Sequence, residues 1–217
     1  MSIPSQIRRN GFCLLRGLIP ENRLRAFKEG DDPERFFGLE RTSRALLGTY
    51  TVYNWTFMED SPRIGLHTDG IIQSTTDKVL CMWVPFDPCG VDAPGLAIVP
   101  AGRRRVINYL RRHFQGKKIP GWSSSSHEWN ETPAFRPVTI REEFGDLVYP
   151  VMNPGDVVLF TNWTIHGSHV TTAMTKKRAA FVYRIRALTS EERRRDNKLK
   201  FLNGLRRIKA RIRSYIP

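Results

Sequence analysis

Two short segments, far apart in the chain, carry residue types that together can bind a metal ion. The first, residues 65–70, contains His67 and Asp69 separated by a single residue. At the end of a β-strand, residues i and i+2 project to the same side, so an imidazole and a carboxylate there can bind one ion together. A His-x-Asp pair alone is common in proteins, and a further ligand must come from elsewhere.

The second segment, residues 153–168, supplies that ligand. A turn leads into an apolar run at 156–160, and a short connection then ends in His166. Two histidines and one carboxylate form the facial triad of non-haem iron(II) oxygenases, which leaves positions open for a cosubstrate and dioxygen. Zinc more often has thiolates or a third histidine. We therefore take His67, Asp69 and His166 as candidate iron ligands. His169 is an alternative that its place further along the strand disfavours.

A basic run at residues 176–178 follows His166 and begins another apparent strand. A cation at this place can meet the far carboxylate of a dicarboxylate whose keto-acid end chelates the metal. Arg178 suits that role because a guanidinium presents two parallel donors to a carboxylate.

The order of these features resembles the phytanoyl-CoA dioxygenase-like family of iron(II)- and 2-oxoglutarate-dependent oxygenases. The shared features are a strand, His-x-Asp, a long interval, Gly-Asp-x-x-x-Phe, His-Gly-Ser and a basic residue. Residues 11–20, 81–86 and 95–102 resemble further family segments, so the resemblance covers roughly residues 8–187.

The resemblance implies a double-stranded β-helix, a jelly-roll variant, with the metal in the mouth of the barrel. It implies Fe(II), 2-oxoglutarate and O2 as cofactors, with release of succinate and CO2, and it places Ser168, Trp83 and Asn54 near the 2-oxoglutarate. The family spacing of the cation falls on Lys177, whereas a one-residue loop insertion selects Arg178. We favour Arg178. The family's Gly-Ser-His-Arg is replaced by residues 101–104, which can reshape the entrance.

The sequence pattern is typical of a mainly β protein. Residues 4–30 predict a short helix, a strand and a helix that starts at 20–21, and residues 29–47 look irregular. Residues 102–113 can form a helix, and 115–137 look like a long loop of the kind that forms a lid or faces the substrate. Short strands with turns between them are typical of a sandwich or barrel, and we expect them at 48–57, 78–86, 95–99, 146–149, 156–160, 166–171 and 178–187.

The 217 residues fit one oxygenase domain, residues 1–188, followed by a basic amphipathic helix at 189–217 that a capping box at 189–192 begins. The formal net charge is +14, and residues 190–217 hold ten Lys/Arg against three Asp/Glu. Such a helix can fold onto its own barrel or lie on an anionic membrane. The small number of aromatic residues in the tail disfavours contact with nucleic acid. The arginines at 103–105 and 111–112 are either a solvated face or an electrostatic funnel.

Cys13, Cys81 and Cys89 show no pairing pattern, and neither a signal core nor a membrane-spanning stretch is evident. We therefore expect a cytoplasmic protein, with peripheral membrane contact as a further possibility.

The leading hypothesis is an oxygenase that hydroxylates a small or lipid-linked, anionic substrate. The alternative is a non-catalytic β-barrel that binds a ligand or associates with nucleic acid through its basic surface. Asp69 disfavours halogenation, because halogenases of this kind replace the carboxylate with a small residue to make room for halide.

Overall fold

The computed structural model describes residues 2–27, 37, 40–48, 50–58, 64–69, 79–114, 133–192 and 194. The strands are β1 (Phe12–Leu15), β2 (Tyr50–Met58), β3 (Val79–Pro85), β4 (Gly95–Ile98), β5 (Val157–Thr161), β6 (His166–His169) and β7 (Ala180–Ala187). The helices are α1 (Ile3–Asn10), α2 (Glu21–Ala26), α4 (Glu40–Leu47), α5 (Arg103–His113) and α6 (Pro137–Phe144), with a 3-10 turn at Pro133–Phe135. None of the described helices is long and apolar enough to cross a membrane.

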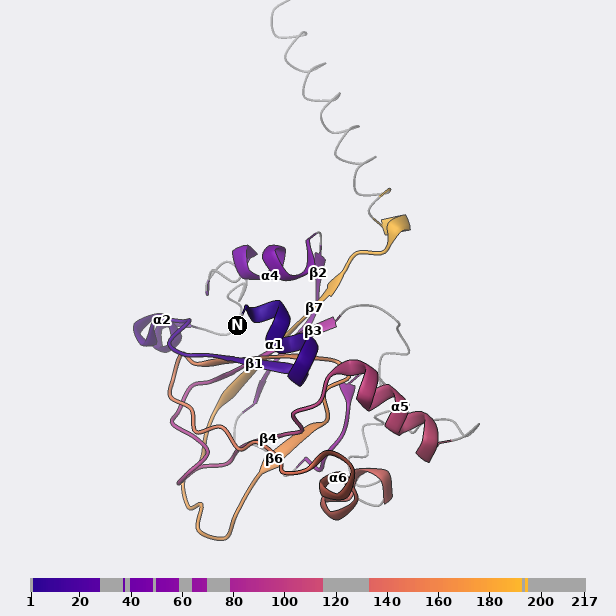
Figure 1. Cartoon of the computed structure of the whole chain (residues 1–217). Coiled ribbons are helices and arrows are strands. Elements are labelled where there is room, and N and C mark those ends of the chain that lie inside the picture. Colours follow the sequence, from indigo (N-terminus) through magenta and orange to yellow (C-terminus); the bar gives the residue numbers. More distant parts are fainter. Residues whose placement is uncertain are drawn as a thin grey trace, which may run out of the picture.

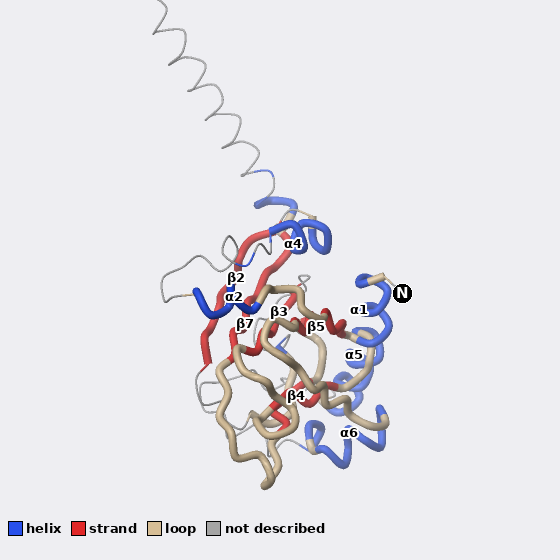
Figure 2. Tube along the Cα trace, turned by 90° about the vertical axis from the view of Figure 1, so that its left-hand side faces the viewer, coloured by secondary structure: helices blue, strands red, loops and turns tan. Residues whose placement is uncertain are grey.

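The strands form two antiparallel sheets. Five strands pair in the order β1-β5-β3-β7-β2, and β4 pairs with β6 in a second sheet. Figure 1 shows α5 and α6 beside β4 and β6, and Figure 2 shows α1, α5 and α6 along one side of the strands. This arrangement confirms the mainly β fold class expected from the sequence.

The central strand β3 is buried on both faces, as its continuous apolar sequence requires. Leu80, Met82 and Val84 face a core on the helical side of the sheet, and side chains of α1 and α4 pack against this core. Cys81 and Trp83 face the opposite core, which lies between the two sheets and includes residues of β4. The interior of the barrel is therefore the face that carries Cys81 and Trp83 of β3.

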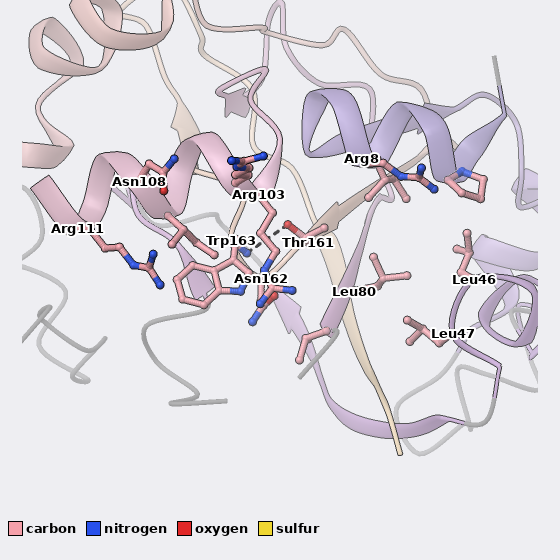
Figure 3. A pocket seen from close by; sticks show the side chains of 15 residues that line it. Arg8, Leu46, Leu47, Leu80, Arg103, Asn108, Arg111, Thr161, Asn162 and Trp163 are labelled. Carbon is pink, nitrogen blue, oxygen red and sulfur yellow. Dashed lines mark hydrogen bonds between the residues drawn. The ribbon is translucent and has the colours of Figure 1, made fainter. Parts of the chain in front are cut away.

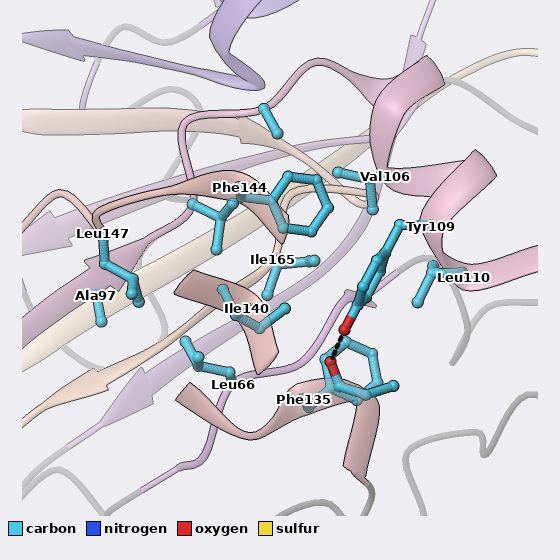
Figure 4. Close-up of a cluster of buried hydrophobic side chains, with 13 residues drawn as sticks. Leu66, Ala97, Val106, Tyr109, Leu110, Phe135, Ile140, Phe144, Leu147 and Ile165 are labelled. Atoms are coloured by element: carbon cyan, nitrogen blue, oxygen red, sulfur yellow. Dashed lines mark hydrogen bonds between the residues drawn. The ribbon is translucent and has the colours of Figure 1, made fainter. Parts of the chain in front are cut away.

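A third core fixes the second sheet to the helices beside it. Ala97 of β4 packs with Val106 and Tyr109 of α5 and with Ile140 and Phe144 of α6 (Figure 4). The Tyr109 hydroxyl donates a hydrogen bond to the Ala134 carbonyl, which ties α5 to the 3-10 turn. Burial raises the pKa of Tyr109 to about 12, so this hydroxyl keeps its proton at neutral pH.

The turn into β5 requires a glycine. Gly155 has φ +90°, and a Cβ added there would lie 2.1 Å from the Ile19 carbonyl oxygen. The Ile19 N–H in turn donates to the Gly155 carbonyl over 3.0 Å. This close approach joins the segment after β1 to the start of β5, the strand that leads to His166.

Three sequence expectations for elements are wrong. Residues 29–47, expected to be irregular, contain α4, where Glu40 and Arg44 pair one turn apart. Residues 133–137, assigned to a long loop, hold the 3-10 turn and the start of α6, while 115–132 lie outside the described residues. Residues 146–149 form only an isolated bridge between Val148 and Ile98. The other expected strands are present, with ends that differ by a few residues.

The start of the expected C-terminal helix lies within the described residues. The Thr189 hydroxyl accepts from the Glu192 N–H over 3.1 Å, and a Glu192 carboxylate oxygen accepts from the Thr189 N–H over 2.9 Å. These reciprocal bonds are the capping box that the sequence predicted. Residues 195–217 lie outside the described part of the chain, so the amphipathic helix remains a prediction.

Candidate metal centre

His67 and His166 lie side by side between the two sheets. Their backbones form an isolated antiparallel bridge, in which each N–H donates to the other's carbonyl over 2.8 and 2.9 Å. Their ring centroids are 4.4 Å apart. Asp69 completes a buried group whose ligand atoms all lie within 4.8 Å of one another. The structure thus brings together the three candidate ligands identified in the sequence.

Backbone carbonyls set the orientation of both imidazole rings. Nδ1 of His67 lies 2.9 Å from the Gly65 carbonyl oxygen, and Nδ1 of His166 lies 3.0 Å from that of Thr164. A carbonyl only accepts hydrogen bonds, so each Nδ1 carries the proton and donates it. In this tautomer of a neutral ring, Nε2 has an available lone pair, which is the state that a metal ion requires.

His166 is neutral at physiological pH. Burial is the largest effect on it, and together with the neighbouring His67 it lowers the pKa of His166 to about 4 in spite of the Asp69 charge. The ring also packs against Phe160, with centroids 4.4 Å apart. This imidazole is therefore ready to act as a metal ligand without first losing a proton.

Asp69 is ionised and is held through both of its oxygens. Oδ1 lies 3.6 Å from Nε2 of His67, while Oδ2 accepts from Nε of Arg184 and from the Cys81 thiol, each over 3.2 Å. Burial alone would raise the pKa of Asp69. The contact with His67 and the charge of Arg184 outweigh burial and hold the pKa of Asp69 well below its usual range.

Two neighbours of Asp69, Cys81 and Arg184, keep the protons that they donate to its carboxylate. Burial and then the Asp69 charge raise the pKa of Cys81 well above its usual range, so the thiol stays protonated and serves as a donor. Burial would lower the pKa of Arg184, but the Asp69 charge more than offsets it. The imidazoles of His67 and His166 and the carboxylate of Asp69 are thus the available ligands, a set that suits a divalent iron ion.

Arg178 is buried at the end of the interior where β7 begins. Its guanidinium carbon lies 4.6 Å from the centre of the Trp83 ring, and its Nε donates to the Pro94 carbonyl. Nη1 is buried and has no hydrogen-bond partner among the described residues. Burial lowers the pKa of Arg178 to about 10, which still leaves it charged at neutral pH. Lys177, the alternative cation, is exposed.

The structure describes the surroundings of Ser168 and His169, two of the remaining candidates, but not the side chain of Asn54. Ser168, on β6, accepts a hydrogen bond from the Ile64 N–H over 3.1 Å, so at least one role of this hydroxyl is to hold backbone. Asn54 pairs in register with Arg184 across β2 and β7, but its side chain lies outside the described residues. The His169 ring lies tilted against the Tyr149 ring, with centroids 4.3 Å apart, and is not part of the group of ligand atoms.

Sequence reasoning missed Arg184 and Cys81. The signal for Arg184 was present, because strand alternation from Ala180 and Val182 puts it on the interior face of β7. A charged residue on a buried face needs a partner of opposite charge, and Asp69 provides it. Cys81 carried no such signal, since a thiol is common in apolar cores.

Comparisons with known proteins agree with this geometry. A family model described as phytanoyl-CoA dioxygenase (PhyH) matches residues 50–179, whereas no curated protein sequence matches the chain. Among solved structures, EvdO2 from Micromonospora carbonacea var. aurantiaca, complexed with 2-oxoglutarate, is similar with a TM-score of 0.59 and 16% identity, covering 86% of this chain and 90% of EvdO2.

A second solved structure is SnoN, a non-heme alpha-ketoglutarate-dependent epimerase from nogalamycin biosynthesis. It has a TM-score of 0.57 and 12% identity, and the likeness covers 86% of this chain and 82% of SnoN. SnoN has also been solved with Fe3+, alpha-ketoglutarate and nogalamycin RO, at a TM-score of 0.55 and 14% identity over 85% and 82% of the two chains. These likenesses confirm the double-stranded β-helix expected from the sequence.

Proposed function

Because the chain belongs to the phytanoyl-CoA dioxygenase family of iron(II)- and 2-oxoglutarate-dependent oxygenases, we propose that His67, Asp69 and His166 bind the iron. The observation that carries this assignment is the convergence of the three ligand atoms within 4.8 Å. When bound, iron(II), 2-oxoglutarate and dioxygen supply the oxidation of a substrate C–H bond, with succinate and CO2 as co-products.

The protein's own contribution is to hold the ligands and the cosubstrate. The carbonyls of Gly65 and Thr164 orient the two imidazoles, so that each Nε2 faces the site. We propose that Arg178 binds the far carboxylate of 2-oxoglutarate against the Trp83 ring. Its buried, unpartnered Nη1 supports this role, because a carboxylate would supply the missing acceptor.

We further propose that the prime substrate is a small, negatively charged molecule. The net charge of +14 supports this, because a strongly positive surface attracts anions over a distance. The segments that we expect to shape specificity are residues 29–47, 70–78 and 103–137, of which 70–78 and 115–132 lie outside the described residues. Incubation of the iron-loaded protein with a cell extract under ¹⁸O2 should label an anionic product other than succinate, which itself takes up one ¹⁸O atom in the reaction. Labelling of neutral compounds alone would contradict the proposed charge.

We also propose a cytoplasmic protein whose tail, residues 190–217, can touch an anionic membrane. Its excess of Lys/Arg over Asp/Glu supports such contact. Vesicles of phosphatidylserine and phosphatidylcholine should sediment the full chain at low salt and release it at high salt. Equal sedimentation by vesicles of phosphatidylcholine alone would contradict an electrostatic mode of binding.

The test of the metal assignment pairs a triad variant with a matched histidine variant. His67→Ala removes a proposed ligand, whereas His169→Ala removes a histidine of β6 that lies outside the group of ligand atoms. Iron content after anaerobic loading and the shift of Tm with Mn2+ report on binding without turnover. Succinate release from 2-oxoglutarate under air reports on activity.

Wild type and His169→Ala should bind about one metal ion per chain and release succinate slowly even without prime substrate. His67→Ala should bind the metal far more weakly, because only two ligands remain, and should release no succinate above background. Equal metal content in all three proteins would remove the assignment. Metal binding without succinate release in wild type would instead support the non-catalytic alternative.

A further inference from the structure

A cavity of about 760 Å³ lies between α5 on one side and α1 and α4 on the other (Figure 3). Its walls also include the start of β3 and the end of β5. Cavities of this size commonly bind small ligands. The residues that line it are Pro4, Ile7, Arg8, Leu46, Leu47, Val79, Leu80, Arg103, Arg104, Ile107, Asn108, Arg111, Thr161, Asn162 and Trp163.

This cavity lies on the other face of the sheet from the metal centre. Leu80, which lines the cavity, packs in the core on the helical side of β3. Cys81, the next residue, faces the interior and contacts Asp69. The side chains of Leu80 and Cys81 thus point to opposite faces of β3, and none of the three metal ligands lines the cavity.

The lining combines an apolar wall with one sign of charge. Seven apolar side chains from α1, α4, β3 and α5 form that wall: Pro4, Ile7, Leu46, Leu47, Val79, Leu80 and Ile107. Four arginines join it, Arg8, Arg103, Arg104 and Arg111, and none of the described residues that line the cavity is Asp or Glu. None of these four forms an ion pair with a residue that the structure describes, whereas the adjacent Arg112 pairs with Glu143 over 2.8 Å.

Two further donors in the lining have no acceptor within the described chain. Nδ2 of Asn162 and Nε1 of Trp163 are buried and make no hydrogen bond there. Asn162 is only 1% exposed, and Figure 3 shows both side chains beside Arg103. Buried donors are normally satisfied, and a ligand with several acceptor oxygens would meet this requirement after small side-chain movements.

From this lining we infer that the cavity binds an anionic amphiphile, with its aliphatic chain against the apolar wall and its carboxylate or phosphate head among the four arginines. Guanidinium groups bind both head groups through paired donors. The chain's own tail is a poor occupant, because residues 190–217 carry ten Lys/Arg against three Asp/Glu and would be repelled.

Calorimetric titration of the iron-loaded full chain tests this with defined probes below their micelle concentrations. Dodecanoate and dodecyl phosphate represent the two head groups, dodecanol lacks the charge, and acetate and inorganic phosphate lack the chain. We expect one dodecanoate or dodecyl phosphate per protein, with dodecanol at least about tenfold weaker and the two small anions without measurable binding. The stronger of the two charged probes identifies the preferred head group.

Paired variants locate the site. Arg8→Glu/Arg111→Glu should weaken binding of the preferred probe at least about tenfold. Arg9→Glu/Arg141→Glu makes the same change in net charge at exposed positions outside the cavity and should leave binding within about twofold of wild type. Ile107→Asn should also weaken binding of the probe, because it puts a polar side chain into the apolar wall. Circular dichroism and Tm confirm that each variant is folded.

Several outcomes would overturn the inference. Equal weakening by both double variants would indicate general attraction rather than a site, and equal binding of dodecanol would remove the role of the arginines. Complete displacement of the bound probe by inorganic phosphate or acetate would indicate a simple anion site. His67→Ala should retain binding of the probe, since the cavity is separate from the metal centre; loss of binding there would place the amphiphile in the barrel instead.

Discussion

Arg184 of β7 donates its Nε to Oδ2 of Asp69 over 3.2 Å, while Oδ1 of the same carboxylate lies 3.6 Å from Nε2 of His67. Oδ2 of Asp69 is therefore held by a residue of β7, and Oδ1 faces the two imidazoles. The Cys81 thiol adds a second donor to Oδ2. Arg184 is in this sense a positioning residue, which acts on the proposed metal site through the carboxylate that it holds.

We predict that Arg184→Gln weakens metal binding by about 10- to 100-fold, the usual cost of losing a residue that orients a metal ligand. Arg184→Lys should recover part of the loss, because it restores the charge without the Nε geometry. Mn2+ affinity, followed by electron paramagnetic resonance, measures the effect without turnover. Arg186→Gln is the matched control, since Arg186 lies on the same strand and pairs with Glu192. An unchanged Mn2+ affinity in Arg184→Gln would show that Asp69 needs no such support.

The two candidate cations for 2-oxoglutarate differ sharply in burial, since Arg178 is 3% exposed and lies over Trp83, whereas Lys177 is exposed. We predict that Arg178→Leu raises the KM for 2-oxoglutarate about 100-fold, corresponding to about 3 kcal/mol for a lost buried charge-assisted pair. Lys177→Ala should change it less than about threefold. Metal affinity should be unchanged in both variants. A larger effect of Lys177→Ala than of Arg178→Leu would reverse the assignment.

The strands and the ligand group were predictable because both follow from short-range patterns. Continuous apolar runs predicted β3 and β5, and residues i and i+2 of a strand end put His67 and Asp69 on one side. The helix α4 was missed because its sequence is mostly polar. It is stabilised by an ion pair one turn apart and by packing of Leu46 and Leu47 against the sheet, a contact that exists only after folding.

The partners of the site residues were not predictable from one sequence. Arg184 is 115 residues from Asp69, and Arg178 reaches Trp83 only because β3 and β7 are neighbours in the sheet. Strand order is set by tertiary packing rather than by local propensity. Residues 146–149 show the opposite error, because the sequence predicted a strand that does not form. Leu147 packs beside α6, and the segment makes only an isolated bridge.

Asp156 gives a prediction for stability and its pH dependence. Its carboxylate accepts from the Gly17 N–H over 2.8 Å, from the Asn153 N–H over 3.0 Å and from Arg16 over 2.7 Å. Burial would raise the pKa of Asp156, but these donors outweigh it and lower the pKa below its ordinary value. Asp156→Asn should reduce the free energy of unfolding at pH 7 by about 2 kcal/mol, because at least one donor loses its acceptor.

The sign of the pH dependence follows from the lowered pKa. The folded state binds a proton at Asp156 less readily than the unfolded state, so this contribution is fully present above about pH 4, the unfolded value. It is lost as the pH falls through the lower folded value. Urea unfolding at pH 7 and pH 3 should therefore show a smaller difference between wild type and Asp156→Asn at pH 3. Asp146→Asn, at an exposed position, is the control, and a difference that grows toward pH 3 would contradict the argument.

The tautomers of the two imidazoles are a direct test of how the backbone prepares the site. In the metal-free protein at pH 7, His166 should be neutral with its proton on Nδ1, because the Thr164 carbonyl accepts there at 3.0 Å. The Gly65 carbonyl holds Nδ1 of His67 in the same way. Long-range ¹H–¹⁵N correlation spectra distinguish a protonated Nδ1 from a protonated Nε2 through the pattern of cross-peaks to the ring protons. His169, with its ring against Tyr149, is an internal reference. A His166 proton on Nε2 would mean that metal binding must first change the tautomer, and the carbonyl contacts would then not prepare the ligand.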